Sequence, residues 1–140
     1  MIVTKTVRFD AAHVLTGHSG QCRNLHGHTY RVDVSVRQPP GEDGDMVMDF
    51  KELKNTIAET VLSRCDHAFI YDATSPAEAE IAAVAEKHGM KTLRLDHRST
   101  AENLARDFYT ALREKIPALH SVRVYETPDS CAEFPGEPAR

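Results

Sequence analysis

The sequence predicts an α+β fold, in which an antiparallel sheet carries its helices on one face. Two stretches of alternating polar and apolar residues open the chain, and no helical pattern separates them, so they most simply pair as an antiparallel hairpin. Three stretches with apolar residues at helical spacing occupy the middle, and a last alternating stretch follows them. The 140 residues fit one domain, which we place at 1–134, with a flexible tail over 135–140.

The composition is that of a globular protein and argues against several functional classes. Hydrophobic residues make up 41% and charged residues 27% of the chain, a balance atypical of disordered proteins. The formal net charge of −4 argues against a nucleic-acid partner, because such modules normally carry a basic excess. No apolar run approaches the roughly 18 residues of a membrane span. The first ten residues contain no apolar export signal, so we expect a cytoplasmic protein.

The alternating stretches predict the strands. Odd-numbered apolar residues predict a first strand over about 2–12, and even-numbered ones predict a second over 30–37. These residues are Val3, Val7, Phe9 and Ala11 in the first strand and Tyr30, Val32, Val34 and Val36 in the second. Two segments rich in Pro and Gly, 38–45 and 134–140, predict a hairpin-type connection and a frayed C-terminus.

Start signals and apolar spacing predict three helices. The helices span about 50–64, 76–88 and 100–116, and two short strands are expected at 92–95 and 121–127. Each helix is preceded by a short polar residue that has Glu three positions further on. The pairs are Asp49 with Glu52, Ser75 with Glu78, and Ser99 with Glu102.

Eight histidines are the unusual feature of the composition, and three of them share a phase along the predicted hairpin. His26 and His28 precede the second strand at even positions, so both point to the face that carries its apolar residues. His13 follows the first strand in phase with its apolar residues. Three imidazoles around one Zn²⁺ would leave a fourth position for water or substrate, as in catalytic sites. The alternative is a chance HxH whose rings are ordinary structural histidines.

Cys22 lies four residues before His26, and three interpretations of it stay open. It could close a structural site as the fourth ligand, it could be an inert thiol, or it could be a catalytic thiolate whose pKa is lowered by a nearby metal or imidazole. Cys65 is more simply explained as a small buried hydrophobe. Cys131 has no partner that the sequence identifies.

Two further groups of polar residues are candidates for chemistry. Asp66 and His67 follow the first predicted helix, and a carboxylate can orient an imidazole, although a favourable His in a helix C-terminal turn explains the pair equally well. Glu126 shares a strand face with Val122 and Val124, where a carboxylate without a partner is costly. Either the strand has left the core there, or Glu126 meets a ligand with paired N–H donors, such as the guanidine-like edge of a pterin or guanine.

Six motifs together resemble one enzyme family. In order, they are FDAAH (9–13), C-x-x-x-H-G-H (22–28), MVMDF (46–50), DH (66–67), STAEN (99–103) and YET (125–127). Each is modest alone, but the ordered set, which extends from about residue 2 to 127, resembles the 6-pyruvoyltetrahydropterin synthase / 6-carboxytetrahydropterin synthase family. The resemblance implies a tunnelling fold (T-fold), in which subunit sheets join into a barrel and stack as a homohexamer.

The resemblance also implies roles for particular residues. It implies Zn²⁺ held by His13, His26 and His28. It implies Cys22 as the catalytic base, with Asp66 and His67 as an acid/base pair supplied from a neighbouring subunit. It implies Glu126 as the pterin anchor, with Thr100 and Glu102 in the pterin-pocket motif.

The activity implied is that of a zinc-dependent lyase acting on 7,8-dihydroneopterin triphosphate. The leading expectation is formation of 6-carboxytetrahydropterin with release of acetaldehyde and triphosphate, on the route to queuosine and other deazapurines. The alternatives are the pyruvoyl-forming synthase and a non-catalytic pterin-binding zinc protein. Two departures from the family pattern are an extra helix and short strand within 72–98, and Cys65 where Leu often precedes the Asp-His pair.

Overall fold

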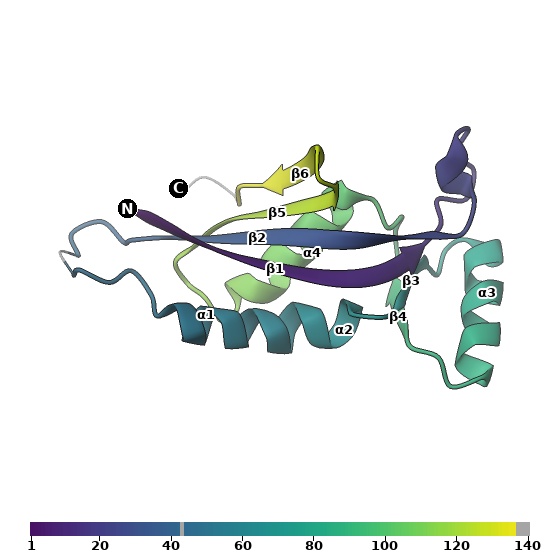
Figure 1. Cartoon of the computed structure of the whole chain (residues 1–140), viewed down its shortest axis with the longest axis horizontal. Coiled ribbons are helices and arrows are strands. Elements are labelled where there is room, and N and C mark those ends of the chain that lie inside the picture. Colours follow the sequence, from purple (N-terminus) through teal and green to yellow (C-terminus); the bar gives the residue numbers. More distant parts are fainter. Residues whose placement is uncertain (43, 137–140) are drawn as a thin grey trace.

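The computed structural model describes residues 1–42 and 44–136 as a six-stranded sheet with helices (Figure 1). The strands are β1 (Ile2–His13), β2 (His26–Arg37), β3 (Phe69–Asp72), β4 (Thr92–Leu95), β5 (Leu119–Thr127) and β6 (Ser130–Phe134). The helical segments are η1 (Gln21–Arg23), α1 (Phe50–Ile57), η2 (Ala58–Leu62), α2 (Ser63–Cys65), α3 (Pro76–Lys87) and α4 (Ala101–Arg113). None of the helices in this part of the chain is long and apolar enough to cross a membrane.

The predicted hairpin of β1 and β2 is confirmed and forms the centre of the sheet. The two strands pair antiparallel along their whole length, from Ile2 opposite Arg37 to His13 opposite His26. The second strand begins four residues earlier than the alternation predicted, because the HGH segment continues the pairing. The strand end that carries the histidines is therefore a regular part of the sheet.

The sheet is mixed, which corrects the prediction of an antiparallel sheet. Its order is β4-β3-β1-β2-β5-β6. The β1–β3 and β3–β4 pairs are parallel, whereas the β1–β2, β2–β5 and β5–β6 pairs are antiparallel. All four residues of β3 are buried, so no alternation marked this strand. The short edge strand β6 was also missed, and Phe134 belongs to it rather than to the tail, of which 137–140 lie outside the described residues.

Helices lie on both faces of the sheet, although they were predicted on one face only; on the second face α3 packs against β3 and β4 and not against the central strands. The main core lies between the central strands and a layer formed by α4 and the α1–η2–α2 run, with Tyr30, Leu53 and Phe108 almost completely buried. The helix α3 does not contribute to this core and packs against β3 and β4. Its Ala82 joins Phe69 and Tyr71, which point to the opposite face of β3 from Ile70 in the main core. The parallel β3–α3–β4 connection places α3 there, at one end of the molecule (Figure 1).

The helix starts follow the sequence closely, with one shift. Asp49 caps α1 by accepting the Lys51 and Glu52 amides at 2.8 and 2.9 Å. The predicted helix over 50–64 is one continuous run to Cys65 with a π-helical turn, η2, inside it. The cap of α4 is Thr100 rather than Ser99, so the predicted helix start was one residue early.

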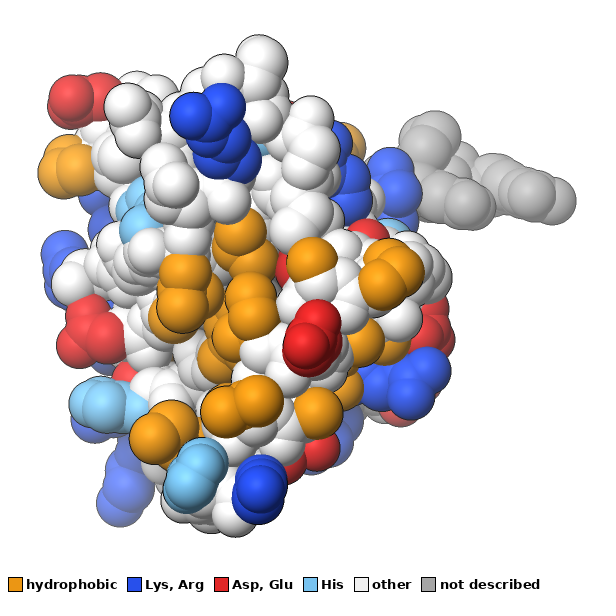
Figure 2. Space-filling view, turned by 90° about the vertical axis from the view of Figure 1, so that its right-hand side faces the viewer, with side chains coloured by type: hydrophobic (Ala, Val, Ile, Leu, Met, Phe, Trp, Pro, Cys, Tyr) orange, Lys and Arg blue, Asp and Glu red, His pale blue; other side chains and the backbone are white. Residues whose placement is uncertain are grey.

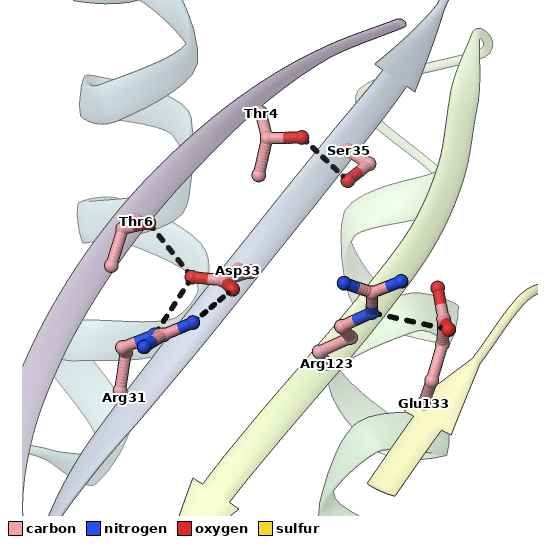
Figure 3. A network of polar contacts seen from close by, with 7 residues as sticks. All are labelled: Thr4, Thr6, Arg31, Asp33, Ser35, Arg123 and Glu133. Carbon is pink, nitrogen blue, oxygen red and sulfur yellow. Dashed lines mark hydrogen bonds and ion pairs between the residues drawn. The ribbon is translucent and has the colours of Figure 1, made fainter. Parts of the chain in front are cut away.

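The face of the central strands that points away from the main core is polar and internally bonded (Figure 3). Asp33, only 8% exposed, accepts hydrogen bonds from Arg31 and Thr6. Burial alone would raise the pKa of Asp33, but these three hydrogen bonds, with the charges of Arg31 and Arg123, outweigh it and lower the pKa below its usual value. Because the polar residues pair on this face, the apolar residues and the histidines of the hairpin share the other.

Candidate metal centre and surrounding site

Three imidazoles converge where β1 ends and β2 begins. The Nε2 atoms of His13, His26 and His28 lie 3.1 to 3.2 Å from one another. The register explains the meeting, because His13 is directly opposite His26, and His28 follows on the same face. Gly27 between the two β2 ligands lies close to β1, since a Cβ there would be 3.1 Å from the Ala11 carbonyl oxygen. The three histidines therefore share one face of the hairpin, as their positions in the sequence predicted.

Backbone carbonyls determine which ring nitrogens face the centre. His13 Nδ1 lies 3.0 Å from the Ser99 carbonyl oxygen, and His26 Nδ1 lies 2.7 Å from the Asn24 carbonyl oxygen. A carbonyl only accepts, so both Nδ1 atoms carry the proton and both Nε2 atoms of the neutral rings are bare. The 3.1 Å approach of these two Nε2 atoms is therefore not a hydrogen bond between neutral rings. Facing lone pairs repel each other unless a cation lies between them.

The spacing and chemistry of the donors fit a transition-metal ion. Three donors at tetrahedral angles, about 2.0–2.1 Å from Zn²⁺, would lie about 3.3 Å apart, close to the spacing observed here. Burial lowers the pKa of His13 to about 4, an effect that the Ser99 hydrogen bond opposes and the other two imidazoles reinforce. Burial and then His26 also lower the pKa of His28. Neutral imidazole is the metal-binding form, so these shifts keep the ligands ready at neutral pH.

Cys22 lies four residues before His26 in the chain and is outside the cluster of three imidazoles. The η1 turn that carries it is tied to the residues after His13, because the Leu15 amide donates to the Cys22 carbonyl oxygen at 2.8 Å. Among residues 1–42 and 44–136, the group of possible ligand atoms within 4.8 Å of one another consists of the three histidines. The thiol is partly buried. This arrangement favours an open fourth position over a closed Cys-His₃ site.

Glu126, Glu102 and Thr100 lie on the same side of the sheet as the imidazoles. Burial, followed by the nearby charge of Glu102, raises the pKa of half-buried Glu126, whereas His26 lowers it. Glu126 is therefore a desolvated carboxylate within electrostatic range of His26, and its ionised form would gain from N–H donors on a ligand. Thr100 Oγ1 accepts the Asn103 amide at 3.3 Å as the cap of α4.

The Asp66–His67 pair faces away from the imidazoles of its own chain. His67 Nδ1 lies 3.0 Å from Asp66 Oδ1, and the His67 side chain is 78% exposed. The His67 amide donates to the Asp10 carbonyl oxygen at 2.7 Å, and His67 adopts a left-handed φ of 61°. The carboxylate therefore orients the imidazole as the sequence suggested, but the pair belongs to another surface.

That surface contains an apolar cavity of ≈ 640 Å³ beside α3. His67 lines it together with Asp10 and Thr29, which point to the face of the hairpin opposite His13, and the cavity is also bordered by His28 at the start of β2. Figure 2 shows this end of the molecule, where hydrophobic side chains gather. The exposed ones on α3 and just after it are Ile81, Val84 and Met90. One chain thus carries the two halves of the predicted site on different faces.

The residues that hold the imidazoles in place were not predicted from the sequence. Ser99, predicted as a helix cap, is completely buried and contacts His13 through its carbonyl and hydroxyl oxygens at 3.0 and 3.2 Å. The loop around Ser99 is in turn held by His97, which contacts Asp107 at 3.0 Å. The STAEN motif marked the segment but not these contacts. No side-chain pattern could reveal the role of Asn24, because it acts through its backbone carbonyl.

The fold and the site together define an α+β protein with three histidines at one end of its sheet that could hold a metal ion. The family described as 6-pyruvoyl tetrahydropterin synthase matches residues 2–137, so the chain belongs to this family. The membership predicted from the ordered motifs is confirmed.

Individual relatives match over almost their entire length. The chain is 40% identical to the 6-carboxy-5,6,7,8-tetrahydropterin synthase of Haemophilus influenzae, over 94% of this chain and 96% of the relative. It is 35% identical to the enzyme of the same name from Aquifex aeolicus, over 96% and 98%. The solved Caenorhabditis elegans 6-pyruvoyl tetrahydropterin synthase superposes with a TM-score of 0.70 at 23% identity, over 98% of this chain and 96% of that chain. This structural match confirms the T-fold of the single chain.

Replacing His28 by Ala should abolish stable metal binding. Two donors remain, so we expect affinity to fall by more than the 10- to 100-fold that loss of an outer-shell partner typically causes. Metal content after extensive dialysis measures this. His120→Ala is the matched control, because His120 contacts Arg37 instead. Wild-type metal content in His28→Ala would refute the three-histidine site.

Proposed function

We propose that this protein is a 6-carboxytetrahydropterin synthase, a lyase that converts 7,8-dihydroneopterin triphosphate to 6-carboxytetrahydropterin, acetaldehyde and triphosphate. The observation that carries the proposal is the 40% identity, across nearly the whole chain, with a curated relative of that name. The three-imidazole centre supplies the kind of site such a reaction needs. Atom balance requires one water, because the carboxylate and acetaldehyde together hold one more oxygen than the two side-chain hydroxyls supply.

The metal in this proposal is Zn²⁺, held by His13, His26 and His28. When bound, it would act as a Lewis acid that lowers the pKa of a substrate hydroxyl at its open position. The Ser99 and Asn24 carbonyls hold two of the rings in the tautomer that presents Nε2. These carbonyls therefore pre-organise the ligands before any metal arrives.

Proton transfer in this proposal is divided between two groups. Cys22 is the base beside the metal centre, and Asp66-oriented His67 is the acid/base group on the other side of the substrate side chain. Because His67 points away from the imidazoles of its own chain, the pair would serve the centre of a neighbouring copy. The homohexamer expected from the resemblance provides such neighbours, so we extend the proposal to sites shared between subunits.

Glu126 is proposed as the anchor of the pterin ring. Its half-buried carboxylate is within electrostatic range of His26, so a ring bound there would have its side chain toward the metal centre. A carboxylate can accept two parallel hydrogen bonds from adjacent N–H groups, which a pterin presents and most other small metabolites do not. Thr100 and Glu102, at the start of α4, would border the same pocket.

Product identification tests the proposed reaction. Incubation of the zinc-loaded protein with dihydroneopterin triphosphate should yield a carboxypterin and an equal amount of acetaldehyde, measured by chromatography and an aldehyde assay. The pyruvoyl-forming alternative gives a pyruvoylpterin without acetaldehyde. That second outcome would reject the assignment as a carboxy-forming enzyme, but it would be consistent with membership of the family.

Replacing Cys22 by Ala should leave zinc binding intact and reduce turnover by at least 10²-fold, because a base is lost while the three ligands remain. Metal analysis and single-turnover assays on the same sample measure both quantities. Cys131→Ala, a change at an exposed cysteine, is the control. Loss of zinc from Cys22→Ala would instead support a structural Cys-His₃ site in a non-catalytic pterin-binding protein.

Replacing Glu126 by Gln should weaken pterin binding about tenfold or more, since an amide offers one acceptor where the carboxylate offers two. Zinc content should stay unchanged, because Glu126 is outside the ligand cluster. Titration with a non-reactive pterin, followed by fluorescence, measures the affinity. Glu133→Gln, at the residue that pairs with Arg123 on the opposite face, is the control. An affinity equal to wild type would contradict the anchor role.

A further inference from the structure

A carboxylate that plays no part in the proposed chemistry is buried at the start of α3. Glu78 is 1% exposed and accepts three hydrogen bonds. Its Oε1 accepts the Thr16 hydroxyl at 2.8 Å and the Thr16 amide at 3.3 Å, and its Oε2 accepts the Asp72 amide at 2.7 Å. A charged group this deeply buried persists only where donors replace its water. Two of its three donors belong to one residue, far away in sequence.

The predicted cap of α3 at Ser75 is confirmed, but the Glu78 side chain does not complete a capping box. In a capping box the Glu at the third position would reach back to the amide of the capping residue, here Ser75. Instead, Glu78 turns toward the β1–β2 connection. Ser75 still caps α3, since its Oγ accepts the Glu78 amide at 3.4 Å, and Ser75 Oγ also lies 2.8 Å from Thr16 Oγ1. Both residues of the predicted cap therefore hold Thr16.

Thr16 belongs to the segment that leads from the first metal ligand to Cys22. We call residues Val14–Cys22 the thiol loop. Thr16 adjoins Leu15, whose amide donates to the Cys22 carbonyl oxygen at 2.8 Å. The Thr16 carbonyl oxygen accepts a further hydrogen bond from Arg98, at 3.4 Å. The hydrogen bonds to Glu78 thus fix Thr16, and its neighbour Leu15 is the residue whose amide binds the Cys22 carbonyl oxygen.

We propose that Glu78 is a positioning residue that holds the thiol loop, and so determines where the Cys22 sulfur lies relative to the three imidazoles. This gives the α3 segment a role in the site without contact with substrate or metal. The link to turnover rests on the proposed function, in which Cys22 is the base. The link to loop order rests only on the hydrogen bonds described here.

The test compares Glu78→Gln with Glu80→Gln, an exposed change in the same helix. A carboxamide has a single acceptor oxygen, so one of the donors that face Glu78 loses its partner. Hydrogen exchange of the peptide covering 14–22, measured by mass spectrometry on the zinc-loaded protein, should accelerate at least tenfold in Glu78→Gln. We expect kcat to fall about 10- to 100-fold, with KM within twofold and zinc content unchanged. The β2 peptide 30–37 should exchange as in wild type.

A second pair of variants isolates the hydroxyl and covers the case in which Glu78→Gln fails to fold. Thr16→Val removes the hydroxyl bonds to Glu78 and Ser75 while keeping similar volume, and should reproduce the faster exchange and lower kcat. Thr16→Ser keeps the hydroxyl and should restore both. If Thr16→Ser behaves like Thr16→Val, packing of the methyl group explains the effect and the proposal is wrong.

The remaining outcomes separate this proposal from the proposed function. If the exchange of the thiol loop in Glu78→Gln equals that in Glu80→Gln, Glu78 does not hold the loop. If exchange accelerates while kcat stays at the wild-type value, loop order does not govern turnover, and the positioning role is overturned. If the wild-type protein itself forms no product, the proposed function fails, and the exchange measurements alone decide whether Glu78 anchors the loop.

Discussion

The register between β1 and β2 is the constraint on which the rest of the site depends. Because His13 lies opposite His26, two imidazoles meet across the strands and His28 completes the set from the same face. A slip of one residue would send every side chain of one strand to the other face. The apolar residues that share the phase of the histidines are buried, so the hydrophobic core holds the ligands in register. Core packing and metal chemistry therefore select the same alignment.

The hairpin, the helices and the shared face of the three histidines were predictable because each depends on a pattern among neighbouring residues. Period-2 alternation located β1 and β2, and caps with apolar spacing located the helices to within a residue or two at most ends. The phase of His13, His26 and His28 followed from the same alternation. The Asp66–His67 contact also follows from a local turn. Patterns of this kind involve only residues that are close in sequence, so they can be recognised without knowledge of the tertiary structure.

The parts that the sequence did not reveal depend on distant contacts. The four buried residues of β3 show no alternation, and parallel pairing with β1 and β4 is a property of the assembled sheet. Ser99 and Glu78 were both predicted as residues of a helix start. In the structure, each also accepts a hydrogen bond from the segment that follows β1, Ser99 from His13 and Glu78 from Thr16. A capping motif in the sequence does not reveal that one of its polar groups forms a hydrogen bond with a residue that is distant in sequence. The face on which Asp66 and His67 lie likewise emerged only from the folded sheet.

The contact between His13 and Ser99 has a consequence for changes in chain length. Ser99 immediately precedes Thr100, which starts α4, so the carbonyl that orients a metal ligand is one residue from a helix start. Inserting or deleting one residue between β4 and α4 would either rotate α4 in the core or replace the Ser99 carbonyl by that of a neighbour. Loop grafting or circular permutation at this connection should therefore be avoided in engineering the protein, even though the connection lies outside the sheet.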